Sequence, residues 1–119
     1  RRPGVRSVLV GGELEERTGS LVGPTAELVA RSMTFDRFFT SASAVDAGFG
    51  MSEVSLDEAS VKLAMAERSS ETVLLADASK LDQQVLARAL GWDSIDVLVT
   101  ELDPRDERLD AYRDLVELV

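Results

Sequence analysis

The sequence predicts an α/β fold in which a mostly parallel sheet is flanked by helices, and three observations support this prediction. Apolar runs rich in branched residues occur at residues 5–12, 72–76 and 95–100, as expected of buried strands. Segments in which apolar residues keep helical spacing lie between these runs. The connections are short, as in folds whose parallel strands are joined by helical crossovers. We expect one domain, since 119 residues suffice for a single core.

The first half of the chain predicts a strand, a helix and a second strand. In "VRSVLVGG", at residues 5–12, branched residues precede two glycines, which is typical of a buried strand that ends in a tight turn. A helix is predicted within residues 21–33, because Pro24 suits the first helical position and the following apolar residues keep helical spacing. The segment rich in phenylalanine that comes next predicts a strand at about residues 37–42.

The second half continues this alternation. The segment "SLDEASVKLAMAERSS" predicts a helix, because Ser55 and Glu58 form a capping box ahead of an apolar face. Strands are predicted at residues 72–76 and 95–100, on either side of a short helix in "QQVLARAL" that ends before Gly91.

The tail of the chain predicts one more helix and the start of a strand. Asp103 and Pro104 are residue types that begin helices, and Leu109 and Tyr112 open an apolar repeat of three to four residues. A last strand is expected to begin near Val119.

Composition argues against several classes of function. The formal charge of −9 repels the phosphates of nucleic acids. Cysteine and histidine do not occur, which removes disulfides, the usual zinc ligands and histidine-dependent nucleophiles. No apolar run approaches the length of a membrane span. Composition therefore disfavours an enzyme and predicts neither a metal nor a cofactor, and the lack of cysteine is compatible with a reducing cytosol.

Polar residues and glycines collect where the predicted strands end. The carboxyl ends of parallel strands share one edge of a sheet, so clusters that are distant in sequence can meet in one crevice there. A lysine at such an edge suits a phosphate group, and nearby acids suit sugar hydroxyls. The candidate ligand-binding residues at the strand ends are Gly11, Gly12, Ser43, Asp46, Asp77 and Lys80.

Each of these candidates also has a purely structural interpretation. The stretch "LLADASK", at residues 74–80, is typical of an ordinary strand-to-helix turn, and the two adjacent glycines are typical of a tight turn. Asp46 precedes "AGFG" and can stabilise a turn. Glu58 and Lys62 lie four residues apart on a predicted helix, as in an exposed ion pair.

Four blocks occur in a specific order along the chain. They are a strand ending in "GG", the segment "DRFFTSASAVDAGFG", the helix segment "EASVKLAM" and the strand end "LLADASK". Over about residues 5–102 this order resembles the sensor domain of the DeoR family of bacterial transcriptional regulators. The resemblance implies a fold like that of ribose-phosphate and glucosamine-phosphate isomerases, with a phosphorylated sugar or related metabolite as effector. The family usually has "FLGA.GI" where this chain has "FFTSASAV", so one wall of the pocket differs.

The resemblance also implies which residues contact the effector. Lys80 matches the lysine of the family's "D.SK" block, which makes it the implied phosphate contact, and Asp46 and Gly50 match a "D...G" loop. The remaining polar positions of the pattern are matched by Asp77, Glu58 and Lys62.

The resemblance further implies a C-terminal part of a longer regulator, with an upstream sensor half and a winged helix-turn-helix outside residues 1–119. DNA contact then belongs to the missing N-terminal domain, the protein is a homo-oligomer, and no membrane is involved. Two alternatives stay open. One is an isomerase-like enzyme with Asp46 or Glu58 as base and Lys80 on phosphate, and the other is an oligomerisation domain without a ligand.

Overall fold

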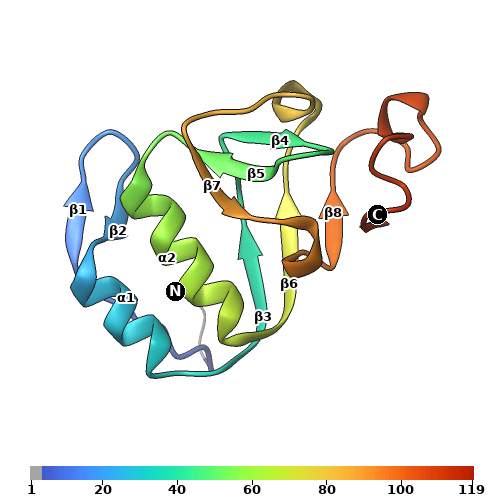
Figure 1. Ribbon diagram of the computed structural model, residues 1–119. Coiled ribbons are helices and arrows are strands. Elements are labelled where there is room, and N and C mark those ends of the chain that lie inside the picture. Colours follow the sequence, from blue (N-terminus) through green and yellow to red (C-terminus); the bar gives the residue numbers. More distant parts are fainter. Residues whose placement is uncertain (1–3) are drawn as a thin grey trace.

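The computed structural model describes residues 4–119, and its centre is a parallel sheet (Figure 1). The sheet contains β3 (Phe35–Thr40), β6 (Ser69–Leu75), β8 (Val97–Val99) and β9 (Glu117–Leu118), in that spatial order. All three strand pairs are parallel. The predicted parallel sheet is therefore confirmed, with the final strand two residues earlier than expected.

A second, antiparallel sheet was not predicted from the sequence. It consists of β4 (Ala44–Asp46), β5 (Gly50–Glu53) and β7 (Ala87–Leu90), with β5 in the centre. The predicted helix in "QQVLARAL" is wrong, because its last four residues form β7. Ala87 and Ala89 are buried while Arg88 between them is exposed, so pairing with β5 outweighs the helical propensity of alanine and leucine.

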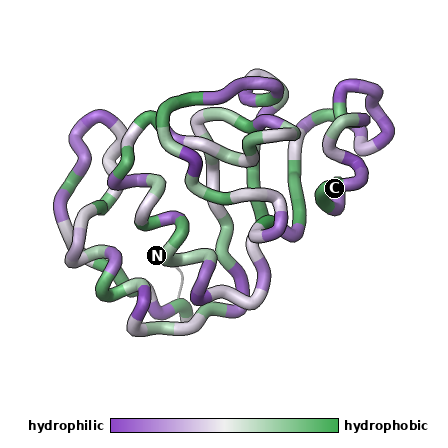
Figure 2. Tube along the Cα trace, viewed as in Figure 1, coloured by the Kyte–Doolittle hydropathy of each residue, from purple (hydrophilic) through white to green (hydrophobic). Residues whose placement is uncertain are grey.

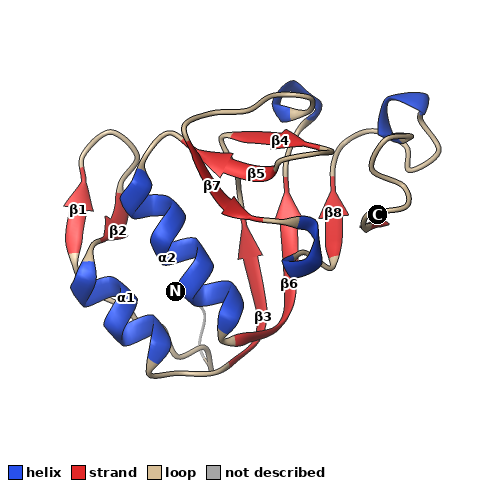
Figure 3. Ribbon diagram, viewed as in Figure 1, coloured by secondary structure: helices blue, strands red, loops and turns tan. Residues whose placement is uncertain are grey.

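Two helices, α1 (Pro24–Arg31) and α2 (Leu56–Glu67), lie on one side of the parallel sheet (Figure 3). Both were predicted, and Pro24 is the first residue of α1 as expected. The capping prediction for α2 is also confirmed, since the Ser55 hydroxyl accepts a hydrogen bond from the backbone N–H of Glu58 at 3.2 Å. In the described chain, α2 contacts α1, β6 and β7, so it joins α1 to both the parallel and the antiparallel sheet.

The predicted strand at residues 5–12 is not formed. Val8 and Leu9 are 64% and 84% exposed, and within residues 4–119 this segment pairs with no strand. An apolar run becomes a strand only when another strand takes up its backbone hydrogen bonds. The next residues form a small hairpin instead, β1 (Glu13–Glu15) and β2 (Ser20–Val22).

The predicted tail helix is also wrong, although its apolar repeat is buried as expected. Only a short 3-10 helix, η3 (Glu107–Leu109), forms, and a series of turns follows it. Leu109, Tyr112 and Val116 are buried, so the spacing of three and four residues does mark the inner face. Arg113 donates to the Pro104 carbonyl at 2.7 Å, which fastens the turns from outside.

The core lies between the two larger sheets, α2 and the tail, while hydrophilic residues dominate the outer turns of the tail (Figure 2). Its largest fully buried side chains include Tyr112, Met51, Leu74, Leu90 and Leu98. Among residues 4–119, no helix has the length and apolar character needed to cross a membrane.

Candidate functional site

The carboxyl ends of β3, β6 and β8 lie at one edge of the parallel sheet, as predicted. The register pairs Thr40 with Leu74 and Leu75 with Val99, so the three strands end side by side. The β4–β5 hairpin crosses beyond this edge (Figure 1). Loops that leave parallel strands at a common edge are the usual place for a ligand in an open α/β sheet.

Lys80 lies at this edge on a short 3-10 helix, η1 (Ala78–Lys80), directly after β6. Asp77 caps η1, and its carboxylate accepts hydrogen bonds from the N–H of Ser79 at 3.0 Å and from the Ser79 hydroxyl. These two bonds are the main reason that the pKa of Asp77 lies below its usual value, and the charge of Lys80 adds to them. Lys80 is partly buried, and its ammonium has no ion-pair partner within residues 4–119.

Beside η1, the ends of β6 and β8 enclose an open crevice of about 460 Å³. Its polar lining is formed by Asp77, Thr100 and Glu101, and its apolar lining by Leu75 and Val99. Glu101 accepts hydrogen bonds of 2.8 Å from the Thr100 hydroxyl and from the N–H of Ala78. The Thr100 bond, followed by backbone N–H donors, holds the pKa of Glu101 below its usual value. Lys80 lies next to this crevice on η1 and is not among the residues that line it. We call Asp77, Lys80, Thr100 and Glu101 the strand-edge site.

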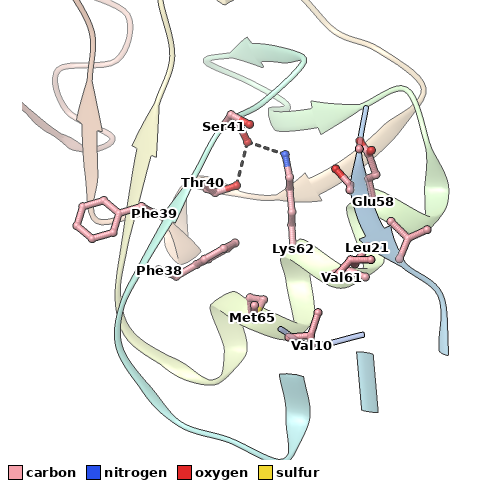
Figure 4. Close-up of a pocket in the computed structure, with 13 residues that line it drawn as sticks. Val10, Leu21, Phe38, Phe39, Thr40, Ser41, Glu58, Val61, Lys62 and Met65 are labelled. Atoms are coloured by element: carbon pink, nitrogen blue, oxygen red, sulfur yellow. Dashed lines mark hydrogen bonds between the residues drawn. The ribbon is translucent and has the colours of Figure 1, made fainter. Parts of the chain in front are cut away.

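Lys62 belongs to a different environment, which we call the Lys62 cluster: Ser41, Ser43, Lys62 and the buried Glu53. The Lys62 ammonium lies 3.1 Å from Glu53 Oε2 and donates to the Ser41 carbonyl at 2.8 Å (Figure 4). Ser43 donates to the same carboxylate from its N–H at 3.1 Å and from its hydroxyl at 3.2 Å. The side chains of Lys62 and Glu53 are only 19% and 3% exposed, so the expected exposed pair between Glu58 and Lys62 is replaced by a buried pair.

Glu53 was not identified from the sequence. An acid that follows "GMS" gives no periodic signal of burial, and its partner lies nine residues further along on α2. A signal did exist in the helix, because Lys62 stands on a face otherwise occupied by buried Ala59 and partly buried Ala66. A lysine in such a place needs a carboxylate close by.

Below the Ser41–Lys62 contact lies a cavity of about 390 Å³ between β2, β3 and α2 (Figure 4). Apolar side chains line most of it, namely Val10, Leu21, Phe38, Val61 and Met65. Glu58 also lines the cavity; it is only 5% exposed and accepts a hydrogen bond from the Thr18 hydroxyl. Phe39 also borders the cavity, but its ring points away from it.

Asp46 and Gly50 hold the β4–β5 hairpin together. Asp46 Oδ2 accepts hydrogen bonds from the N–H groups of Gly48 at 2.9 Å and Phe49 at 2.8 Å, which is the turn-stabilising role left open by the sequence. Gly50 has a φ of +86°, and a Cβ placed on it would meet the Leu90 carbonyl oxygen at 2.3 Å. Glycine is therefore required there by the close approach of β7.

The two adjacent glycines also have structural roles. Both have positive φ angles, +75° for Gly11 and +104° for Gly12, but the predicted tight turn is not formed at these two residues. A Cβ on Gly12 would lie 2.7 Å from the Val22 carbonyl oxygen and 2.9 Å from Ala26 Cβ, so Gly12 lets the chain pass close to β2 and α1. Neither glycine lines the strand-edge crevice.

The structure thus divides the sequence candidates into separate groups. Asp77 and Lys80 are together at the strand edge, with Asp46 on the adjoining hairpin, whose neighbour Val45 bridges Leu81. Glu58 and Lys62 lie together at the other cavity, and Ser43 joins Lys62 through Glu53. Among residues 4–119, no group of three or more acidic side chains is arranged to hold a metal ion.

Comparison with known proteins gives the family of this chain. The family model of the DeoR C-terminal sensor domain matches residues 1–102. An HTH-type transcriptional regulator GlpR from Haloferax volcanii is 37% identical over 103 residues, which cover 83% of this chain and 40% of that protein.

Two repressors are also similar. A putative aga operon transcriptional repressor from Escherichia coli O157:H7 is 28% identical across 92% of this chain and 41% of its own length. A lactose phosphotransferase system repressor from Staphylococcus aureus is 26% identical across 96% of this chain and 45% of its own length. The chain spans about two fifths of the length of these relatives. The match over residues 1–102 establishes that the chain belongs to the DeoR C-terminal sensor-domain family.

Proposed function

We propose that this chain senses a phosphorylated sugar or related metabolite for a DeoR-family transcriptional regulator, and that the effector binds at the strand-edge site. The observation that carries this proposal is the state of Lys80. It lies at the carboxyl edge of a parallel sheet, partly buried, with no ion-pair partner among residues 4–119. An ammonium group has three donors and no acceptor, so a phosphate group is a suitable partner for it.

The neighbouring groups are suited to the rest of such an effector. Asp77 Oδ1 is occupied by Ser79, which leaves Oδ2 to accept a hydrogen bond from a sugar hydroxyl. The pKa values of Asp77 and Glu101 are both lowered, so each carboxylate stays ionised at neutral pH and remains an acceptor. Leu75 and Val99 supply apolar surface beside these groups, as in many small-molecule sites.

The proposed output is a change in the affinity of the regulator for DNA. With a net charge of −9, this domain is a poor partner for DNA phosphates, so DNA contact falls to other parts of a cytoplasmic, homo-oligomeric protein. The effector favours the conformation that it binds more tightly, and the equilibrium between DNA-binding states shifts accordingly. The named relatives are transcriptional regulators or repressors, which supports binding without turnover.

The experiment is isothermal titration of the chain with a panel of hexose and pentose phosphates, beside the matching free sugars. We expect a sugar phosphate to bind while its free sugar does not. Lys80→Ala should weaken that binding by about tenfold or more, because a charge-assisted hydrogen bond is lost.

Arg31→Ala is the matched control, since it removes one positive charge from the end of α1, just before β3 begins at the opposite edge of the sheet. It should leave the affinity unchanged. Equal affinity for sugar phosphate and free sugar, or an equal loss in both variants, would place phosphate recognition away from Lys80.

A further inference from the structure

The loop that follows Lys80 is held by a residue of the tail, Tyr112. The Tyr112 side chain is fully buried, and its hydroxyl donates a hydrogen bond to Asp82 Oδ1 at 2.7 Å. The N–H of Asp82 in turn donates to the same hydroxyl at 3.0 Å. One buried phenol therefore binds both the backbone and the side chain of a residue only two positions after Lys80.

The backbone at Asp82 depends on such a constraint. Asp82 is the one residue other than glycine in the described chain with a positive φ, at 61°. Residues other than glycine adopt this left-handed conformation when neighbouring interactions hold them in it. The reciprocal bonds to Tyr112 supply that interaction, and they set the direction in which the chain leaves η1.

The same hydroxyl also faces the hairpin that carries Asp46. It lies 3.4 Å from the Val45 carbonyl oxygen, which accepts a hydrogen bond from the N–H of Gln83 at 3.1 Å. Trp92, in the short 3-10 helix η2 (Trp92–Ser94), packs edge-on against the Tyr112 ring with centroids 5.5 Å apart. Its indole N–H donates to the Asp46 carbonyl at 3.0 Å. The loop after Lys80 therefore contacts Tyr112 directly, and the hairpin that carries Asp46 contacts Tyr112 and its packing partner Trp92.

The tail is well placed to act as the support of this loop. It leaves the sheet at β8 and returns to it at β9, so both of its ends are fixed, and it runs beside β8 (Figure 1). Residues 103–119 follow the last residue matched by the family model. Burial, and then the hydrogen bond with Asp82, raises the pKa of Tyr112 above its usual value, so its hydroxyl keeps its proton at neutral pH and can donate it to Asp82.

We propose that Tyr112 is a positioning residue for effector binding, because its hydroxyl fixes residues 81–83 against β4 and so holds Lys80 at the strand-edge site. This inference rests on the proposed function for the identity of the ligand. The geometry of the loop itself does not require a ligand, so the two can be tested separately.

The test uses Tyr112→Phe, which keeps the buried ring and its contact with Trp92 but removes the hydroxyl. Amide hydrogen exchange is followed by NMR in the free protein. We expect the N–H of Asp82 to exchange about tenfold faster than in the parent protein, since it loses its acceptor. The N–H groups of Leu74 and Leu98 in the core should keep the exchange rates that they have in the parent protein. Leu109→Ala is the control, because it weakens the packing of the same tail without touching the hydroxyl.

The second readout is affinity for glucose 6-phosphate and for inorganic phosphate, followed by the fluorescence of Trp92, the only tryptophan. We expect Tyr112→Phe to weaken binding by about tenfold at a temperature where the variant is fully folded, and Leu109→Ala to leave it unchanged. Asp82→Gly keeps the positive φ but removes the carboxylate, and it should weaken binding to a similar degree without adding to the effect of Tyr112→Phe.

The outcomes separate the two proposals. If Lys80→Ala weakens binding but Tyr112→Phe does not, Lys80 binds the phosphate and the positioning role is wrong. If Asp82 exchanges at the same rate in Tyr112→Phe, the hydroxyl does not fix the loop, whatever the ligand results show. If neither phosphate compound binds the parent protein while the Asp82 N–H does exchange faster in Tyr112→Phe, the contact between Tyr112 and Asp82 has a structural role only. The ligand part of this inference is then overturned, together with this choice of effector.

Discussion

Lys62 and Lys80 are the only lysines of the chain, and they occupy opposite kinds of environment. Lys62 is enclosed between α2 and the sheets, with the Glu53 carboxylate and the Ser41 carbonyl as partners. Lys80 lies on η1 at the sheet edge, near Asp77 but with no ion-pair partner among residues 4–119. Both match polar positions of the family pattern, yet Lys62 already has two protein partners, whereas the Lys80 ammonium has no ion-pair partner among residues 4–119.

The difference indicates that the family pattern combines a lysine available to a ligand with residues whose own contacts maintain the fold. Asp46, Gly50 and Gly12 take part in turns and close backbone contacts, and the Glu53 carboxylate forms an ion pair with Lys62. Such residues stabilise the fold through their own contacts. Their replacement should therefore lower stability first, whereas replacement of Lys80 should lower affinity with little change in stability.

The largest effect is expected for Lys62→Met. The Glu53 carboxylate would remain buried with only Ser43 as partner. A buried charge left without its counter-charge lowers the free energy of unfolding by about 4 kcal/mol. Urea denaturation measures this loss. In the same assay Lys80→Ala should change stability by less than about 0.5 kcal/mol, as for a surface substitution.

A double variant tests the cause of that loss. Lys62→Met combined with Glu53→Gln should recover much of the stability, because a buried amide costs less than a buried carboxylate and still accepts the N–H of Ser43. Equal stability of the parent and Lys62→Met would mean that the two lysines do not differ in the way proposed.

The next largest effect is expected at the β4–β5 hairpin. Gly50→Ala should cost about 3 kcal/mol, since the new Cβ must displace the Leu90 carbonyl and the φ of +86° is also unfavourable. Gly11→Ala is the matched control, with a similar φ of +75° but nothing within 4 Å of the new Cβ. It should cost only about 1 kcal/mol in the same denaturation experiment. Equal losses would show that β7 yields to the methyl group.

The hairpin also shows where sequence reasoning reached its limit. The strands "TVLLA" and "IDVLVT" were identified because they are continuous apolar runs, and α2 because its cap is local. The antiparallel sheet was missed because "VDAGFGMSE" and "ARAL" mix small and polar residues, and only their mutual pairing makes them strands. The roles of Lys80 and Lys62 could not be separated for the same reason, since the partner of Lys62 lies on one of the missed strands.

The tail was misassigned for a related reason. Leu109, Tyr112 and Val116 have helical spacing and are buried, but short turns present them equally well when Asp106 and Arg113 satisfy the backbone from outside. The contact of Tyr112 with Asp82, thirty residues away, leaves no local trace in the sequence. Spacing therefore predicted which side chains face inward, but neither the backbone conformation nor the loop that Tyr112 holds.

The smallest effect concerns the acids of the strand-edge site. The pKa of Asp77 is lowered chiefly by the Ser79 hydroxyl, so Ser79→Ala should raise that pKa toward its usual value. A carboxyl whose pKa is lower in the folded than in the unfolded chain stabilises the folded state. This stabilisation is complete above the usual pKa of an aspartate and is lost as the pH falls through the folded value, and it should be smaller in Ser79→Ala. NMR titration of the Asp77 carboxyl carbon measures the change. Glu101 should titrate as before, since its main donor is Thr100, and a parallel shift of both acids would mean that they respond to a common field rather than to their own hydroxyl partners.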